Sequence, residues 1–98
     1  MARTSWEDMK AARTGDSAVE AAYAAAKLAF ELGEQVRGLR EERGWSQRDL
    51  AKLTGMTQPA IARLEAGGTT PTLPILQRIA SAFDTTLSVQ LKPRAVAA

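Results

Sequence analysis

The stretch from Ser46 to Gly68 reads SQRDLAKLTGMTQPAIARLEAGG and decides the fold that we expect. It divides into two segments of helical character, 47–54 and about 58–66, with one glycine at the end of the first. Short helical segments on the two sides of a glycine predict a pair of helices joined by a tight turn.

Both segments begin with residues that are typical of helix N-termini. Ser46 precedes the first helix, and Asp49 stands three residues later, much as the acid of a capping box does. Thr57 precedes the second helix, and Pro59 falls in its first turn, where the missing N–H group costs nothing. Two short helices that are both capped favour a helix-turn-helix; an ordinary hairpin in a helical bundle is the alternative.

A helix-turn-helix also needs particular residues where its helices meet. Ala51 places a small residue inside the first helix, so that the second helix can cross it closely, and Leu50 and Leu53 are expected to face the core. Gly55 provides the turn, and Ile61 provides a branched apolar side chain that holds the two helices together. The spacing of these residues predicts a DNA-binding helix-turn-helix.

The rest of the chain predicts further helices. Helical patterns cover 6–13, 18–32, 33–43 and 73–83. Gly33 marks a kink or a break, so that 18–43 forms either one bent helix or two.

The first of these long segments carries an apolar stripe of Val19, Tyr23, Ala26 and Phe30. The stripe either extends the core of the domain or contacts a partner protein. Trp6, on the short first helix, is expected to bury its side chain against another part of the structure.

Near the C-terminus the apolar period changes from that of a helix to that of a strand. Leu87, Val89 and Leu91 alternate with polar residues, which predicts a half-buried β-strand. A lone strand needs a partner edge for its backbone groups, so we expect it to pair with the same strand of a second copy or with an edge of another protein. An isolated extended tail is the alternative.

The composition excludes most classes of enzyme. The chain has no cysteine and no histidine, which removes disulfides, thiolate nucleophiles, the commonest general base and the commonest metal ligand. No confined pair of carboxylates replaces them, so we expect neither an enzyme nor a metal or other cofactor. The net charge of +2 agrees with nucleic-acid binding without requiring it. We find no membrane span and no signal peptide, and therefore expect a cytoplasmic protein.

The longer pattern LREERGWSQRDLAKLTGMTQPAIARLEAGGTTPTLPILQRIASAF resembles the Xre/Cro-like helix-turn-helix family of repressors. The similarity covers roughly 33–84 and implies an all-α, lambda-repressor-like domain in which the helix 58–66 enters the major groove of DNA. We accordingly divide the chain into an N-terminal helical extension (1–32), the DNA-binding domain (33–84), a short dimerising β-strand (85–92) and a tail (93–98).

The resemblance implies roles for three side chains. Gln47 matches the glutamine with which the family clamps a phosphate at the start of the first motif helix. Arg40 and Glu65 match a partly buried ion pair that ties the preceding helix to the end of the recognition helix. Taken singly, the same two residues are also compatible with solvated surface charges.

Three side chains are candidates for reading DNA bases. Gln58 suits adenine, Arg63 suits guanine, and Thr57 suits a thymine methyl group or a phosphate. Contacts with flanking phosphates are expected from Arg43, Arg48, Lys52, Thr69 and Thr70. Each basic residue of this set is equally compatible with a solvated face.

The segments around the motif resemble HigA-type antitoxins of type II toxin–antitoxin systems. The similarity lies in the start SWEDMKAAR, the Ala/Glu-rich helix running into FELGEQVRGLREERG, and the terminal LSVQLKP. It implies a prokaryotic, nucleoid-associated homodimer that binds a palindromic double-stranded DNA operator, represses its own operon and neutralises a small basic, RelE-like ribonuclease toxin. The alternatives are a stand-alone Xre-type repressor and, in another class, a protein-interaction module that does not bind DNA.

Overall fold

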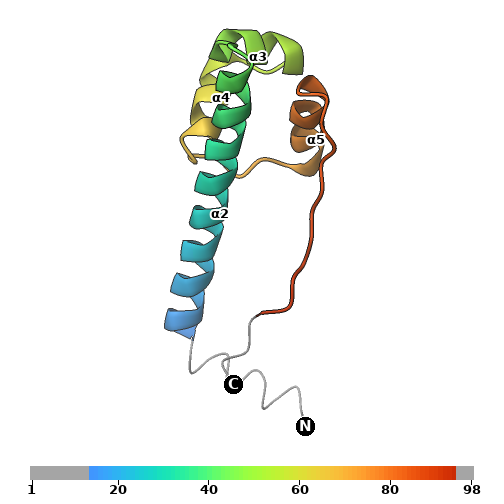
Figure 1. Ribbon diagram of the computed structural model, residues 1–98. Helices are drawn as coiled ribbons and strands as arrows, with labels where there is room; N and C mark the ends of the chain where they lie inside the picture. The colour runs from blue at the N-terminus through green and yellow to red at the C-terminus, as the bar shows by residue number, and fades with distance from the viewer. Residues whose placement is uncertain (1–13, 95–98) are drawn as a thin grey trace.

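The computed structural model describes residues 14–94, in which four helices are formed. They are α2 (Thr14–Glu42), α3 (Gln47–Thr54), α4 (Gln58–Glu65) and α5 (Leu73–Ala82). Figure 1 shows α3, α4 and α5 gathered around the C-terminal half of α2, whose N-terminal half extends away from them. The helix expected at 6–13, with Trp6, lies outside the described residues. Within 14–94, no helix combines the length and the apolar character that a membrane span requires.

The region around Gly33 is one uninterrupted helix. α2 runs through this residue, so the glycine neither breaks the helix nor separates two helices. Gly33 instead permits close packing, because a Cβ atom there would lie 2.5 Å from the carbonyl oxygen of Leu64 and 2.6 Å from that of Glu65. The absence of a side chain lets α2 pass directly against the C-terminal end of α4.

The core lies where α3, α4 and α5 meet the C-terminal half of α2. Leu50, Ile61 and Phe83 are fully buried, and Ala51 is buried as the motif predicted. Leu53, which we expected to face inward, is exposed, and Thr54 is buried in its place. The Thr54 hydroxyl donates a hydrogen bond to the carbonyl oxygen of Leu50 at 2.8 Å, which satisfies this buried polar group. The full set of buried apolar residues is Val36, Leu50, Ala51, Ile61, Leu64, Ile79, Ala80 and Phe83.

The predicted caps of α3 are confirmed. The Ser46 hydroxyl accepts a hydrogen bond from the backbone N–H of Asp49 at 3.0 Å, and the Asp49 carboxylate accepts one from the backbone N–H of Ser46 at 2.8 Å. These two hydrogen bonds hold the pKa of Asp49 below its ordinary value, and the bond from the Ser46 backbone has the larger effect. Gly55 ends the helix in the left-handed conformation, at φ 72°.

The predicted C-terminal β-strand is wrong for this structure. The segment 85–94 follows α5 without forming a strand, and of its three alternating apolar residues only Leu87 is half-buried, whereas Val89 and Leu91 are exposed. The apolar residues do alternate with polar ones, but a strand also needs hydrogen-bond partners for its backbone, which alternation alone does not supply. The described residues of the chain contain no strand with which this segment could pair.

The N-terminal half of α2 does not extend the core. Val19, Tyr23 and Phe30 of the predicted stripe are exposed, because α3, α4 and α5 pack only on the other half of the helix (Figure 1). The interpretation of this stripe as additional core is therefore wrong.

Candidate nucleic-acid interface

The motif presents one face of α4 away from the core. Thr57 caps this helix, its hydroxyl accepting a hydrogen bond from the backbone N–H of Ala60 at 3.2 Å. Ile61, Leu64 and Glu65 are buried, and they fix the side of α4 that faces the rest of the domain. The opposite face is available to a partner.

Gln58 lies at one edge of this outer face, and Arg63 lies near its middle. Five residues at 3.6 residues per turn place their side chains about 140° apart around the helix axis. Gln58 is half-buried, whereas Arg63 and the first-turn Pro59 are exposed. Ala62 and Pro59 lie between them, so that the polar side chains of this face are Gln58 at its edge and Arg63 near its middle.

Arg63 lies next to the loop that follows α4. A small pocket is lined by Arg63 together with Thr69 and Thr70, two of the residues expected to contact phosphate. The structure therefore brings one expected base-reading residue and two expected phosphate-binding residues close together. All three are exposed.

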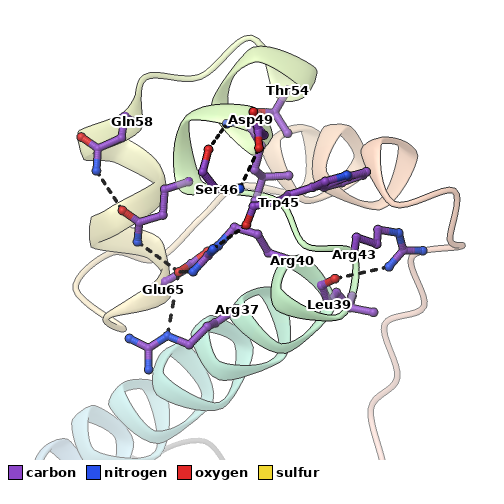
Figure 2. Close-up of polar contacts among 12 residues, drawn as sticks. Arg37, Leu39, Arg40, Arg43, Trp45, Ser46, Asp49, Thr54, Gln58 and Glu65 are labelled. Carbon is purple, nitrogen blue, oxygen red and sulfur yellow. Dashed lines mark hydrogen bonds and ion pairs between the residues drawn. The ribbon is translucent and has the colours of Figure 1, made fainter.

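The expected ion pair between Arg40 and Glu65 is present and is largely shielded from solvent. The Arg40 Nε group donates to Glu65 Oε2 at 2.7 Å and Nη2 donates to Oε1 at 3.0 Å (Figure 2). The Glu65 side chain is 1% exposed and that of Arg40 is 13% exposed. Hydrogen bonding to Glu65 is the largest cause that raises the pKa of Arg40. The pair joins α2 to the end of α4 and so orients the outer face.

Gln47 connects this ion pair to Gln58. Its Nε2 group donates to Glu65 Oε1 at 3.1 Å, and its Oε1 atom accepts a hydrogen bond from Gln58 Nε2 at 2.8 Å. A side-chain amide carries two N–H groups, so Gln47 keeps one donor for the phosphate contact that we expect. This link from the core to the start of α4 was not predicted from the sequence.

The basic residues expected at phosphates differ in their surroundings. Arg48, in the first turn of α3, and Lys52, in its last turn, are both exposed. Arg43 instead donates a hydrogen bond from Nη2 to the carbonyl oxygen of Phe83 at 2.7 Å, and its guanidinium lies over the rings of Trp45 and Phe83. Figure 2 places Arg43 on the side of α2 away from Gln58, so the structure does not bring it to the outer face of α4.

Trp45 is a structural residue that the sequence reasoning missed. Its ring stacks on that of Phe83 with 5.4 Å between centroids, and its carbonyl oxygen accepts a hydrogen bond from Arg40 Nη1 at 2.8 Å. The signal was available, since Trp45 directly precedes the cap Ser46, where a hydrophobic staple residue is expected. The cap of α5, Thr72, was also missed; its hydroxyl accepts a hydrogen bond from the backbone N–H of Ile75 at 3.4 Å.

Known proteins are similar to this chain in sequence. The chain is 32% identical over 66 residues to the HTH-type transcriptional regulator SutR of Escherichia coli, covering 67% of this chain and 37% of that protein. It is 39% identical over 58 residues to the HTH-type transcriptional regulator DdrOP3 of Deinococcus deserti, covering 59% and 45% of the two chains. The chain thus spans less than half the length of these two relatives.

Among solved structures, the restriction-modification controller protein C.AhdI of Aeromonas hydrophila superposes with a TM-score of 0.60 at 28% identity, over 62% of this chain and 88% of that one. A family model described as Helix-turn-helix (HTH_3) matches residues 36–90, more than half of the chain. With the α3–α4 geometry, this match shows that the protein belongs to the Xre/Cro-like HTH_3 helix-turn-helix family.

Proposed function

We propose that this protein is a DNA-binding transcriptional regulator that reads an operator with α4 in the major groove. The observation that carries the proposal is the orientation of α4. Ile61 and Glu65 are held inward, while Gln58 stands at one edge of the outer face and Arg63 near its middle. Relatives named as transcriptional regulators support the same assignment.

The test is an electrophoretic mobility shift with the DNA upstream of the protein's own coding sequence. The wild-type protein is expected to retard this fragment, with an affinity that falls steeply as salt rises, because phosphate contacts release counterions. A double variant, Gln58→Ala with Arg63→Ala, should keep the wild-type circular dichroism spectrum and lose the specific shift. Absence of any retardation at low salt would instead support an interaction module that does not bind DNA.

We further infer that the regulator acts as a homodimer on a palindromic operator. Two copies present two recognition helices to half-sites about one helical turn, or 34–36 Å, apart. The exposed Val89 and Leu91 provide apolar surface that a second copy would cover. Sedimentation equilibrium should give a dimer for the wild type and a monomer for a Val89→Ser, Leu91→Ser variant; a wild-type monomer would count against this assembly.

The antitoxin role is the finer part of the proposal and rests on the N-terminal half of α2. Val19, Tyr23, Leu28 and Phe30 are 68%, 74%, 67% and 52% exposed, although a helix with so much apolar surface is normally covered. Along residues 18–34 the exposed charged residues are three acids, Glu20, Glu31 and Glu34, and one base, Lys27. An apolar and acidic helix suits a small basic protein, as a RelE-like ribonuclease toxin would be.

Co-expression with the neighbouring reading frame tests this role. The two products should co-purify, and a Tyr23→Asp, Phe30→Asp variant should lose the partner while still retarding the operator fragment. A matched Lys27→Ala variant, which changes the same stretch without removing apolar surface, should keep the partner. If no neighbouring product co-purifies, a stand-alone repressor is favoured, in agreement with the regulators found as relatives.

A further inference from the structure

Pro59 is the residue of α4 that points most directly away from the core. Successive residues of an α-helix are about 100° apart around its axis, which places Pro59 about 120–160° from each of the three buried residues of α4. These buried residues are Ile61, Leu64 and Glu65. Gln58, by contrast, lies within about 20° of Glu65 around the axis. Pro59 is exposed, so a proline ring stands at the centre of the face that we propose for reading DNA.

The ring of Pro59 has nothing with which to form a hydrogen bond. It has no polar side-chain atom, and it lacks the backbone N–H group, which the first turn of a helix does not need. A polar base edge that is pressed against the ring therefore loses its hydrogen bonds to water and gains none in return. The major groove contains one apolar group that avoids this cost, the C5-methyl group of thymine.

The ring is also held in a fixed position. Before it in the chain, the Thr57 hydroxyl caps α4 by accepting a hydrogen bond from the backbone N–H of Ala60 at 3.2 Å, and after it Ile61 is fully buried. Proline loses no side-chain rotamer freedom when its surface is covered. Contact with one thymine methyl group should therefore contribute close to the full effect of burying one such group, which is about fourfold in affinity.

We propose that Pro59 reads the C5-methyl group of a thymine by apolar contact, and so makes α4 prefer thymine over cytosine at one base pair of each half-site. Around the helix axis Pro59 lies between Gln58 and Arg63, which leaves hydrogen bonding to the base pairs on either side of this thymine. The inference rests on the proposed function, since it assumes that α4 enters the major groove.

Replacing thymidine by deoxyuridine tests the contact, because it removes only the methyl group and leaves every hydrogen-bonding group of the base in place. Duplexes from the operator fragment, with one thymine of a half-site replaced at a time, are compared with the parent duplex by fluorescence anisotropy. One replacement should weaken binding of the wild type by about fourfold, and the same replacement should weaken binding of Pro59→Ala by less than about twofold. An equal loss in both proteins at every thymine would overturn the proposal.

5-Methylcytosine tests whether the methyl group is sufficient. Cytosine in place of the same thymine changes the hydrogen-bonding groups as well as the methyl group, and 5-methylcytosine restores the methyl group alone. The wild type should bind the 5-methylcytosine duplex about fourfold more tightly than the cytosine duplex, whereas Pro59→Ala should bind both alike. Equal binding of the wild type to both duplexes would contradict apolar reading.

Pro74→Ala and Thr57→Ser are the matched controls. Pro74 is exposed at the corresponding position in the first turn of α5, so its replacement restores a backbone N–H group in the same way in another helix. It should leave the ratio of thymine to deoxyuridine binding unchanged. Thr57→Ser removes a methyl group but keeps the hydroxyl that caps α4. Loss of the ratio in Thr57→Ser, with its retention in Pro59→Ala, would assign the thymine to Thr57 and overturn the proposal.

The two proposals fail in different ways. If Pro59→Ala weakens binding to thymine and deoxyuridine duplexes equally, the ring has only a structural role and DNA reading by α4 stands. If the wild type binds no operator duplex at low salt, the proposed function fails, and thymine reading by Pro59 fails with it.

Discussion

Gly33 of α2 and Glu65 of α4 approach so closely that only a glycine fits between the two helices. A Cβ atom at Gly33 would lie 2.6 Å from the carbonyl oxygen and 2.9 Å from the carbonyl carbon of Glu65. These are backbone atoms, which cannot move aside as the end of a long side chain does. The side chain of the same residue, Glu65, forms the ion pair with Arg40. One residue of α4 therefore provides both the close backbone contact and the buried ion pair with α2.

Gly33→Ala should lower the free energy of unfolding by at least about 1–3 kcal/mol, as overpacking does in other cores. Gly38→Ala is the matched control, because it lies in the same helix with no atom within 4 Å of its added Cβ. It should stabilise the protein by about 0.5–1 kcal/mol, since alanine is the better helix former. Urea denaturation followed by circular dichroism compares the two. Equal stability of Gly33→Ala and wild type would show that the α2–α4 contact is loose.

The features that sequence reasoning predicted correctly depend on near neighbours in the chain. Ser46 and Thr57 were identified as caps because a capping hydrogen bond spans only three residues. Whether Gly33 kinks or breaks the helix stayed open, because the backbone of Glu65, which explains the glycine, lies 32 positions further along the sequence.

The misassigned residues were decided by tertiary context. Leu53 is exposed and Thr54 buried because the position of α3 against its neighbours, and not hydrophobicity alone, selects the inward face. The stripe of Val19, Tyr23 and Phe30 has the period of a packed helix, yet no other element of residues 14–94 covers it. At the candidate site, Gln47 and Gln58 were recognised from their type and spacing. Their hydrogen-bonded link to Glu65 depends on how α3 packs against α4, which the sequence pattern does not give.

Removing the positive partner of the buried ion pair should be strongly destabilising. Arg40→Met leaves the Glu65 carboxylate buried without its bidentate partner and also removes the hydrogen bond to the Trp45 carbonyl. The free energy of unfolding should fall by about 3–5 kcal/mol. Thermal and urea denaturation measure this loss.

Arg37→Met is the matched control. Arg37 Nε lies at the longer distance of 3.9 Å from Oε1 of the same carboxylate, and the Arg37 side chain is 55% exposed. Its effect should stay below about 1 kcal/mol, as for other solvent-exposed pairs. If Arg40→Met costs no more than Arg37→Met, the ion pair does not hold α2 to α4.

The capping box of α3 should make stability depend on pH in acid. The pKa of Asp49 is lowered below its ordinary value of 3.8, chiefly by the hydrogen bond from the Ser46 backbone. A lowered folded-state pKa means that the stabilisation is complete above the ordinary value and is lost as the pH falls through the lowered one. The difference in unfolding free energy between wild type and Asp49→Asn should therefore be largest at neutral pH and shrink in this acid range.

Glu20→Gln provides the control for the loss of one negative charge, since Glu20 is exposed on the N-terminal half of α2. A difference between wild type and Asp49→Asn that stays constant from neutral pH into strong acid would show that the capping carboxylate does not act through its charge.

Arg63 and Lys52 should affect DNA binding in different ways. Arg63 stands near the middle of the exposed outer face of α4, so Arg63→Ala should cost about 1–3 kcal/mol of binding free energy and relax specificity at one base pair. Lys52 is exposed on α3 and is expected to contact phosphate, so Lys52→Ala should weaken binding to all sequences alike and reduce the salt slope by about 1. Fluorescence anisotropy separates the two patterns when it is measured with a duplex from the operator fragment and with its single-base variants at several salt concentrations. Uniform weakening by Arg63→Ala would reassign Arg63 to a phosphate contact, together with its neighbours Thr69 and Thr70. Gln58 and the cap residue Thr57 would then remain as the polar candidates for reading bases.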